Sequence, residues 1–113
     1  MNLRKIIENL KLKVLTPSVN LDTNIKTAYT SDLLSDVIAN SQEKSLWITL
    51  QTHQNIIAVA KLKDLSGIII VNNRKPDPET LKKAAIEKIS LLTSRNTAFE
   101  ISGKLYQLII GKE

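Results

Sequence analysis

The sequence contains no cysteine, one histidine, three glycines, three prolines and only 4% aromatic residues. The absence of cysteine excludes disulfides, zinc–thiolate sites and thiol nucleophiles. With His53 as the single histidine, a histidine-rich metal centre is excluded as well. Few aromatic side chains mean few surfaces on which the bases of single-stranded nucleic acid stack. Any binding or catalytic site must therefore be built from the groups that remain: polar side chains, backbone amides and a large set of lysines and arginines.

The three glycines, Gly67, Gly103 and Gly111, are spaced too widely to form a phosphate-binding loop. A P-loop requires G-x-x-x-x-G-K-[ST], and the dinucleotide-binding loop requires G-x-G-x-x-G. No serine stands in the G-x-S-x-G context of a hydrolase nucleophile. The chain is therefore not a P-loop kinase, and we expect no enzymatic activity, no cofactor and no metal.

Long apolar runs are also missing, since none approaches the roughly 18 residues that a membrane-spanning helix needs. The first residues alternate charged and aliphatic side chains and lack the continuous apolar segment of a signal peptide. The absence of cysteine fits a reducing compartment. We therefore expect no membrane association and a cytoplasmic location.

The composition is that of a soluble globular protein. The chain has 113 residues, of which 42% are hydrophobic and 24% charged, so we expect a single domain over residues 1–113 that buries about two-thirds of its unfolded surface. The net charge of +5 favours an anionic partner. Because the bases are dispersed singly or in pairs, a solvated basic surface explains them better than nucleic-acid binding does.

The first half of the chain shows short segments of alternating character. The pattern predicts a helix over 3–10, a strand over 11–15 that stops at Thr16-Pro17, a polar connection over 18–24, a strand over 25–29, and a helix over 32–39 capped by Thr30 or Ser31. Asp32 would lie in the first turn of that helix, where the helix dipole favours a carboxylate.

The second half alternates strand and helix regularly. The predicted elements are a strand over 45–50, a helix over 54–63, a strand over 68–71, a helix from Asp77-Pro78-Glu79 to about 88, a strand over 89–92, and a helix from Thr93 or Ser94 to about 108. This βαβαβα order from about residue 45 predicts an α/β fold, a mostly parallel sheet with helices on its faces. The all-aliphatic run 68–71 is typical of an interior parallel strand. Gly103, inside the last helix, suggests close packing there.

The segment 47–61 runs from a buried strand through a polar turn into a helix start. This is the usual geometry of a ligand crevice in α/β proteins, because helix N-termini and strand carboxyl ends meet there. We therefore select Thr52, His53 and Asn55 as candidate ligand-binding residues. Asn73 and Arg74 follow the next strand and join them, since an arginine can hold a phosphate or carboxylate through two hydrogen bonds. The alternative is purely structural: Thr52 caps the helix, His53 is an exposed first-turn residue, and Arg74 lies in a solvated turn.

Other residues have both a functional and a structural interpretation. Residues 93–96 follow the last strand and reach the same sheet edge. Asp32 and Asp36 lie four positions apart and could hold Mg²⁺ or act as an acid/base pair, but the helix dipole and ordinary exposure explain them better. Trp47 could line a pocket, lie in a dimer interface or pack in the core.

The residues Ser31-Asp-Leu-Leu-Ser-Asp-Val37 followed by 47–60 (WITLQTHQNIIAVA) resemble the short, stand-alone members of the DRTGG-domain family. Ala98-Phe-Glu100 with Gly103-Lys-Leu-Tyr106 fits the same family, so the likeness covers nearly the whole chain. Related domains form the N-terminal part of HPr kinase/phosphorylase, or stand beside CBS domains and in some phosphotransacetylases. The resemblance implies a regulatory or dimerising module without catalysis, and a homodimer.

One feature of the family is missing. The pentapeptide that names it is absent, and the corresponding region, 65–73, contains LSGIIIVNN. A role tied to that motif therefore cannot be transferred to this chain. The leading hypothesis is a non-catalytic regulatory or interaction module that senses a small anionic ligand or contacts a partner protein. The alternative is a small hydrolase or transferase with His53 as general base, and nucleic-acid binding ranks third.

Overall fold

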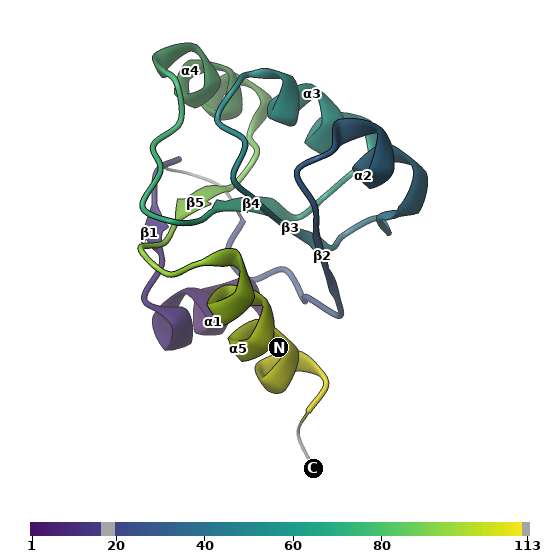
Figure 1. Ribbon diagram of the computed structural model, residues 1–113, viewed down its shortest axis with the longest axis vertical. Helices are drawn as coiled ribbons and strands as arrows, with labels where there is room; N and C mark the ends of the chain where they lie inside the picture. Colours follow the sequence, from purple (N-terminus) through teal and green to yellow (C-terminus); the bar gives the residue numbers. More distant parts are fainter. Residues whose placement is uncertain (17–19, 112–113) are drawn as a thin grey trace.

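The computed structural model describes residues 1–16 and 20–111, and over these residues the chain forms a five-stranded sheet with helices on both faces (Figure 1). The elements, in chain order, are α1 (Leu3–Leu10), β1 (Lys13–Val14), β2 (Ala28–Thr30), α2 (Leu34–Asn40), β3 (Leu46–Thr49), α3 (Asn55–Leu62), β4 (Gly67–Ile70), α4 (Pro78–Glu87), β5 (Leu91–Thr93) and α5 (Ala98–Ile109).

The strands lie in the order β1-β5-β4-β3-β2. Strands β2 to β5 are parallel, and β1 runs antiparallel to β5 with Lys13 opposite Thr93. The predicted α/β class, with strand and helix alternating from about residue 45, is confirmed. The alternation begins even earlier, because β2 and α2 precede β3 in the same arrangement.

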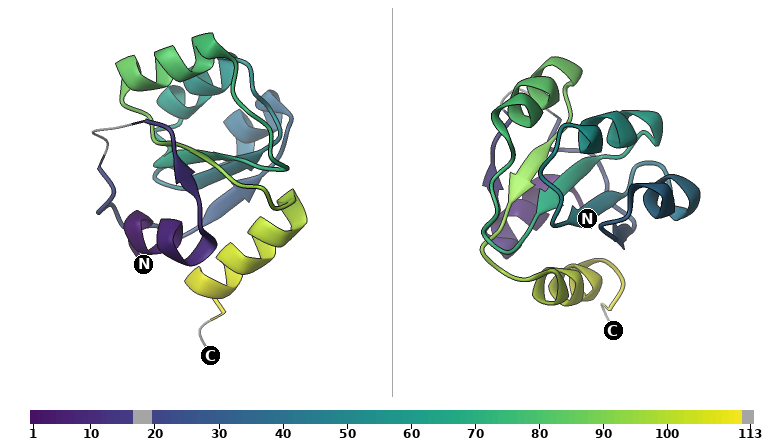
Figure 2. Two further views of the ribbon diagram at one scale, coloured as in Figure 1. Left: turned by 90° about the vertical axis from the view of Figure 1, so that its left-hand side faces the viewer. Right: turned by 45° about the horizontal axis from the view of Figure 1, so that its top comes forward.

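The helices divide between the two faces of the sheet. Helices α2, α3 and α4 cover one face, and α1 and α5 cover the other, as the views in Figures 1 and 2 agree. The chain thus leaves β4 toward one face and leaves the neighbouring β5 toward the opposite face. In open α/β sheets such a change of face is where ligand crevices form, outside the carboxyl ends of the strands.

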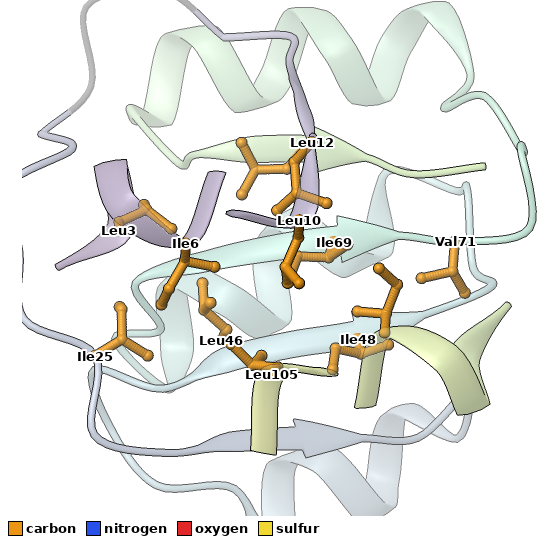
Figure 3. Close-up of a cluster of buried hydrophobic side chains, with 12 residues drawn as sticks. Leu3, Ile6, Leu10, Leu12, Ile25, Leu46, Ile48, Ile69, Val71 and Leu105 are labelled. Atoms are coloured by element: carbon orange, nitrogen blue, oxygen red, sulfur yellow. The ribbon is translucent and has the colours of Figure 1, made fainter. Parts of the chain in front are cut away.

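The core consists of one hydrophobic layer on each face. Ile48 and Ile69 point into the layer with α1 and α5 (Figure 3), whereas Trp47 and Ile68 point into the layer with α2, α3 and α4. This division follows from the twofold alternation of side chains along a strand. Strand β4 is buried on both faces, as the aliphatic run 68–71 predicts.

Local signals explain most helix ends. The Asn2 side chain accepts a 2.9 Å hydrogen bond from the backbone N–H of Lys5 and so caps α1. The same helix ends at Lys11, which takes a left-handed conformation with φ 55°. Pro78 occupies the first turn of α4, where its missing N–H costs nothing.

Strand β2 begins further along the sequence than predicted and covers residues 28–30 instead of 25–29. Ile25 is buried in the core, but its N–H donates to the Met1 carbonyl at 2.8 Å and not to the sheet. Burial of an aliphatic residue outside a strand produced the wrong boundary. Residues 17–19, which include Pro17 and the start of the predicted connection 18–24, lie outside the described residues.

Helix α2 begins two residues later than predicted, and neither expected cap forms. Leu33 occupies the cap position without a side-chain hydrogen bond. The Ser31 hydroxyl accepts from the N–H of Leu33 at 3.2 Å, and the Thr30 hydroxyl pairs with that of Ser102 at 2.7 Å. Asp32 lies ahead of the helix, so the prediction that places it in the first turn is wrong.

Helix α5 also begins later than predicted, at Ala98 instead of 93 or 94. Its cap is Thr97, whose hydroxyl accepts from the Glu100 N–H at 3.2 Å while the Glu100 carboxylate accepts from the Thr97 N–H at 2.9 Å. This reciprocal pair is a capping box. The expected close packing at Gly103 is wrong, since, apart from its chain neighbours and the backbone of α5 itself, no described atom lies within 4 Å of a Cβ placed there.

Within the described ranges no helix combines the length and apolarity required to cross a bilayer.

Candidate functional site

The turn after β3 carries the first candidate residues, and Thr52 is its structural anchor. The Thr52 carbonyl accepts hydrogen bonds from the Asp77 N–H at 3.1 Å and from the Thr80 hydroxyl at 2.7 Å. These bonds fix the start of α4 against the turn. Thr52 does not cap α3, because Gln54 occupies that position without a side-chain hydrogen bond.

His53 and Asn55 are bonded to each other at the start of α3. The Nδ1 atom of His53 accepts a 3.1 Å hydrogen bond from the backbone N–H of Asn55, which satisfies one of the free amides at a helix N-terminus. Both residues are exposed. Among the described residues no hydroxyl or carboxylate side chain hydrogen bonds to His53, so the geometry supplies no observation in favour of a general base.

Thr52 and Arg74 line the same small hollow at the carboxyl edge of the sheet. The hollow measures about 210 Å³, and Leu50, Gln51 and Asp32 complete its lining. We call it the Thr52 hollow. The structure thus places Thr52 and Arg74 together, as predicted for residues that follow neighbouring parallel strands.

Asp32 brings a carboxylate into the Thr52 hollow. Its Oδ1 atom accepts from the Thr49 hydroxyl at 2.8 Å and from the Leu50 N–H at 2.7 Å, and its carbonyl accepts from the Gln51 amide at 2.8 Å. Asp32 therefore holds the end of β3 against the segment that leads to α2. A carboxylate at this position repels an anion in the same hollow.

Asp36 does not pair with Asp32. The Tyr29 hydroxyl donates to its two carboxylate oxygens at 2.8 and 2.9 Å, and the Asn40 amide donates to it at 2.8 Å. Hydrogen bonding by the hydroxyl of Ser31, by Asn40 and by Tyr29 holds the pKa of Asp36 below its usual value of 3.8. In return, hydrogen bonding to Asp36 raises the pKa of Tyr29 above 10.0.

The two aspartates therefore serve separate structural contacts. In the described part of the chain, no cluster of three or more histidine, aspartate or glutamate side chains is placed to hold a metal ion.

A larger hollow of about 640 Å³, which we call the basic groove, lies beside the Thr52 hollow. It is lined by residues of β1 and β5, of the start of α4, of the end of α1 and of the loops after β1, β4 and β5. The lining residues are Lys11, Lys13, Leu15, Asn73, Arg74, Lys75, Pro76, Leu81, Thr93, Ser94 and Arg95. Among the described residues the lining includes five cations and no carboxylate, and none of these cations forms an ion pair with another described residue.

The loop after β4 is held in an unusual conformation. Asn72 and Asn73 both have left-handed backbones, with φ 64° and 57°. Their N–H groups donate to the carbonyls of Asn96 at 2.7 Å and Ser94 at 2.9 Å. Asparagine tolerates this region better than most residues, so the sequence Asn-Asn suits a tight connection between the two loops.

Trp47 lies in the core and lines neither hollow. Its side chain is fully buried, and Nε1 donates a 2.8 Å hydrogen bond to the Ser31 carbonyl. Of its three interpretations, the structure supports core packing.

The predicted site is therefore divided. Thr52 and Arg74 line the Thr52 hollow, Asn73 and Arg74 line the basic groove, and His53 and Asn55 line neither. Sequence reasoning missed the contribution of Lys11 and Lys13. No local pattern marks these lysines as site residues, since they reach the groove only through the pairing of β1 with β5.

No protein-family model and no curated protein sequence matches the chain. A solved structure is similar: the CBS and DRTGG domains of the regulatory region of Clostridium perfringens pyrophosphatase, complexed with the activator diadenosine tetraphosphate. The likeness has a TM-score of 0.67 at 16% identity and covers 90% of this chain and 44% of that chain. The chain thus spans less than half of the structure it resembles. At this identity the likeness establishes the fold alone, and that fold is DRTGG-like.

Proposed function

We propose that this chain is a cytoplasmic regulatory or interaction module that forms a single DRTGG-like domain, lacks catalytic activity and binds a small anionic ligand at the carboxyl edge of its sheet. The observation that carries the proposal is the cation-lined edge where Arg74 stands between the Thr52 hollow and the basic groove. The similar structure supports it, because that protein's regulatory region was crystallised with a nucleotide activator.

The ligand-binding residues that we propose are those selected from the sequence: Thr52, His53, Asn55, Asn73 and Arg74. Arg74 is the strongest of them because its exposed guanidinium has no described ionic partner and can bind an oxyanion in a bidentate manner. Among the described residues no hydrogen bond engages the Thr52 hydroxyl, which leaves it available as a donor.

Thermal unfolding with a panel of nucleotides, phosphorylated sugars and acyl phosphates tests the binding. A ligand at 100 times its Kd stabilises the folded state by about 2.7 kcal/mol, which raises Tm by on the order of 10 °C in a chain of this size. Arg74→Gln should reduce this shift in Tm. Lys26→Gln is the control and should not, because Lys26 is an exposed cation that precedes β2, at the opposite edge of the sheet from Arg74. No shift with any member of the panel would overturn the binding proposal.

We also propose that the module is a homodimer, as the resemblance implies, and that α5 forms the interface. Phe99, Tyr106 and Ile110 are 87%, 60% and 50% exposed, and their spacing places them with Gly103 on one face of the helix. Apolar side chains gathered on one exposed face are typical of protein–protein contacts. The interface would join two copies of this chain, with partner proteins as the alternative occupant.

Light scattering at micromolar concentration tests the dimer. The expected result is twice the chain mass for the native protein and the mass of one chain for Phe99→Ser. Ile86→Ser is the matched control, because Ile86 is 69% exposed on α4, on the opposite face of the sheet. A native protein that remains a single chain at this concentration would contradict the dimer without affecting the ligand proposal.

A further inference from the structure

We propose that the basic groove is a site for an organic ligand that carries a chain of at least two phosphates, and that Lys13 and Arg95 bind those phosphates. This inference rests on the proposed anion-binding function and names its ligand class. It also moves the centre of the site from the Thr52 hollow to the groove between β1, β5 and α4. Three features of the groove support this assignment: its charge, its shape and the hydrogen-bonded backbone of its lining segments.

The charge of the groove exceeds what one phosphate neutralises. Among the described lining residues there are five cations, Lys11, Lys13, Arg74, Lys75 and Arg95, with no carboxylate. A phosphate monoester carries a charge of about −1.5 to −2 at neutral pH, so it would leave most of these charges uncompensated. A chain of two or three phosphates matches them, and clefts lined by charges of one sign concentrate ligands of the opposite sign.

The Thr52 hollow is less suitable for such a ligand. Its volume is about 210 Å³, a third of that of the basic groove, and Asp32 contributes a carboxylate to its lining. Arg74 is its only cation among the described residues. A polyphosphate would meet repulsion there and attraction in the basic groove.

The basic groove also has an apolar side. Leu15, Pro76 and Leu81 line it together with the cations, and Leu81 is 39% exposed on α4. The volume of about 640 Å³ lies within the range of roughly 300–1,000 Å³ that is usual for small-molecule sites. An organic group such as a nucleoside therefore fits against the leucines while its phosphates lie among the cations.

Backbone hydrogen bonds hold the segments that line the groove in place. Lys13 stands opposite Thr93 in the β1–β5 ladder, and its neighbour Leu12 is buried in the core. Arg74 and Arg95 extend from loops that the Asn73–Ser94 and Asn72–Asn96 hydrogen bonds hold together. The side chains are long and mobile, but their points of attachment do not need to reorganise, which lowers the entropic cost of binding.

Calorimetric titration of the full chain with ATP, ADP, AMP, inorganic tripolyphosphate and a single-stranded oligonucleotide, at about 0.1 M salt without divalent cations, tests the proposal. We expect ATP and ADP to bind at least about tenfold more tightly than AMP, since each lost charge-assisted contact costs roughly that factor. Lys13→Gln and Arg95→Gln should each raise the Kd of ATP about tenfold. Lys26→Gln removes the same charge elsewhere and should leave it unchanged.

Leu81→Gln separates the organic group from the phosphates. It should weaken ATP binding while the affinity for inorganic tripolyphosphate stays the same, because only the nucleoside contacts Leu81. Equal weakening of both ligands would contradict the apolar side of the site. All these positions are exposed, and the fluorescence of buried Trp47 verifies that each variant is folded.

The remaining outcomes distinguish the two proposals. If ATP affinity is insensitive to Lys13→Gln and Arg95→Gln but falls in Arg74→Gln and Thr52→Val, the ligand occupies the Thr52 hollow, and the groove proposal is wrong while the anion-binding function stands. If the oligonucleotide binds more tightly than ATP and tripolyphosphate, the groove is a nucleic-acid surface and the small-ligand assignment fails. If none of the probes and no member of the wider panel binds, both proposals are overturned.

Discussion

The backbone N–H of Asn73 donates a 2.9 Å hydrogen bond to the carbonyl oxygen of Ser94, which fastens the loop after β4 to the loop after β5. The two loops lead to helices on opposite faces of the sheet, so their contact links the two helical layers at the carboxyl edge. Arg74 and Arg95 each follow directly after one of the bonded residues. The spacing between the backbone attachment points of these two cations is therefore set by this hydrogen bond.

Replacement of Asn72 tests the cost of this loop conformation. Asn72→Val should lower the free energy of unfolding by about 1–2 kcal/mol, because a β-branched residue at φ 64° meets the clash of the left-handed region. Asn72→Gly is the control, and its free energy of unfolding should lie within a few tenths of a kcal/mol of the native value or slightly above it. Urea unfolding followed by Trp47 fluorescence measures both, and equal stability of the two variants would contradict the assigned backbone.

Asp32→Asn tests whether the carboxylate keeps anions out of the Thr52 hollow. The asparagine oxygen can still accept from the Thr49 hydroxyl and the Leu50 N–H, so the loss of stability should stay near 1 kcal/mol. Binding of inorganic phosphate at the hollow should become stronger, whereas ATP binding in the basic groove should change little. Calorimetry of the two ligands gives the comparison, and an unchanged phosphate affinity would show that Asp32 does not control the hollow.

The contacts of Asp36 predict a dependence of stability on acid pH. Its pKa is lowered in the folded state by hydrogen bonding from Ser31, Asn40 and Tyr29, so its contribution is fully present above 3.8 and is lost as the pH falls through the lowered value. Asp36→Asn should therefore be less stable than the native chain at neutral pH and similar to it in strong acid. Urea unfolding over this pH range makes the measurement, and a stability difference that does not depend on pH would contradict the assignment.

In the Phe99→Ser background, in which the proposed dimer is broken, Gly103→Ala should stabilise the domain. Apart from the chain neighbours and the backbone of α5 itself, no described atom lies within 4 Å of the added methyl group, and alanine is about 1 kcal/mol more favourable than glycine inside a helix. Thermal unfolding should show a rise in Tm of about 4 °C. The equivalent change at Gly67, where the leucine of β3 and the backbone of Ser90 lie 3.2 Å from the added atom, should lower Tm and serves as the contrast.

Short-range signals predicted much of the fold. Two predictions are confirmed: a strand buried on both faces at the aliphatic run 68–71, and a helix start at Asp77-Pro78. Both follow from local sequence, namely a continuous aliphatic run and the fixed geometry of proline. The start of α5 was also readable from the sequence, since Thr97 and Glu100 have the spacing of a capping box. The prediction that this helix begins at Thr93 is wrong because Thr93 belongs to β5, where it pairs with Ile70.

The site was harder to predict because it depends on contacts between distant residues. Thr52 and Arg74 could be grouped, since parallel strands bring their carboxyl ends to one edge. Lys13 could not, because nothing near it in the sequence specifies that β1 pairs with β5. As the only histidine, His53 suggests a role in a site, yet its Nδ1 atom accepts a hydrogen bond from the N–H of Asn55.

The pairing of Lys13 with Thr93 also joins two segments that lie far apart in the sequence. Strands β3 and β4 are much nearer to each other along the chain and pair directly. Contacts between distant residues cost more chain entropy to close and form more slowly than contacts between near ones. We therefore expect the basic groove, which needs both β1 and β5, to be among the last features to form as the chain folds, and a variant that lacks β5 would have no groove.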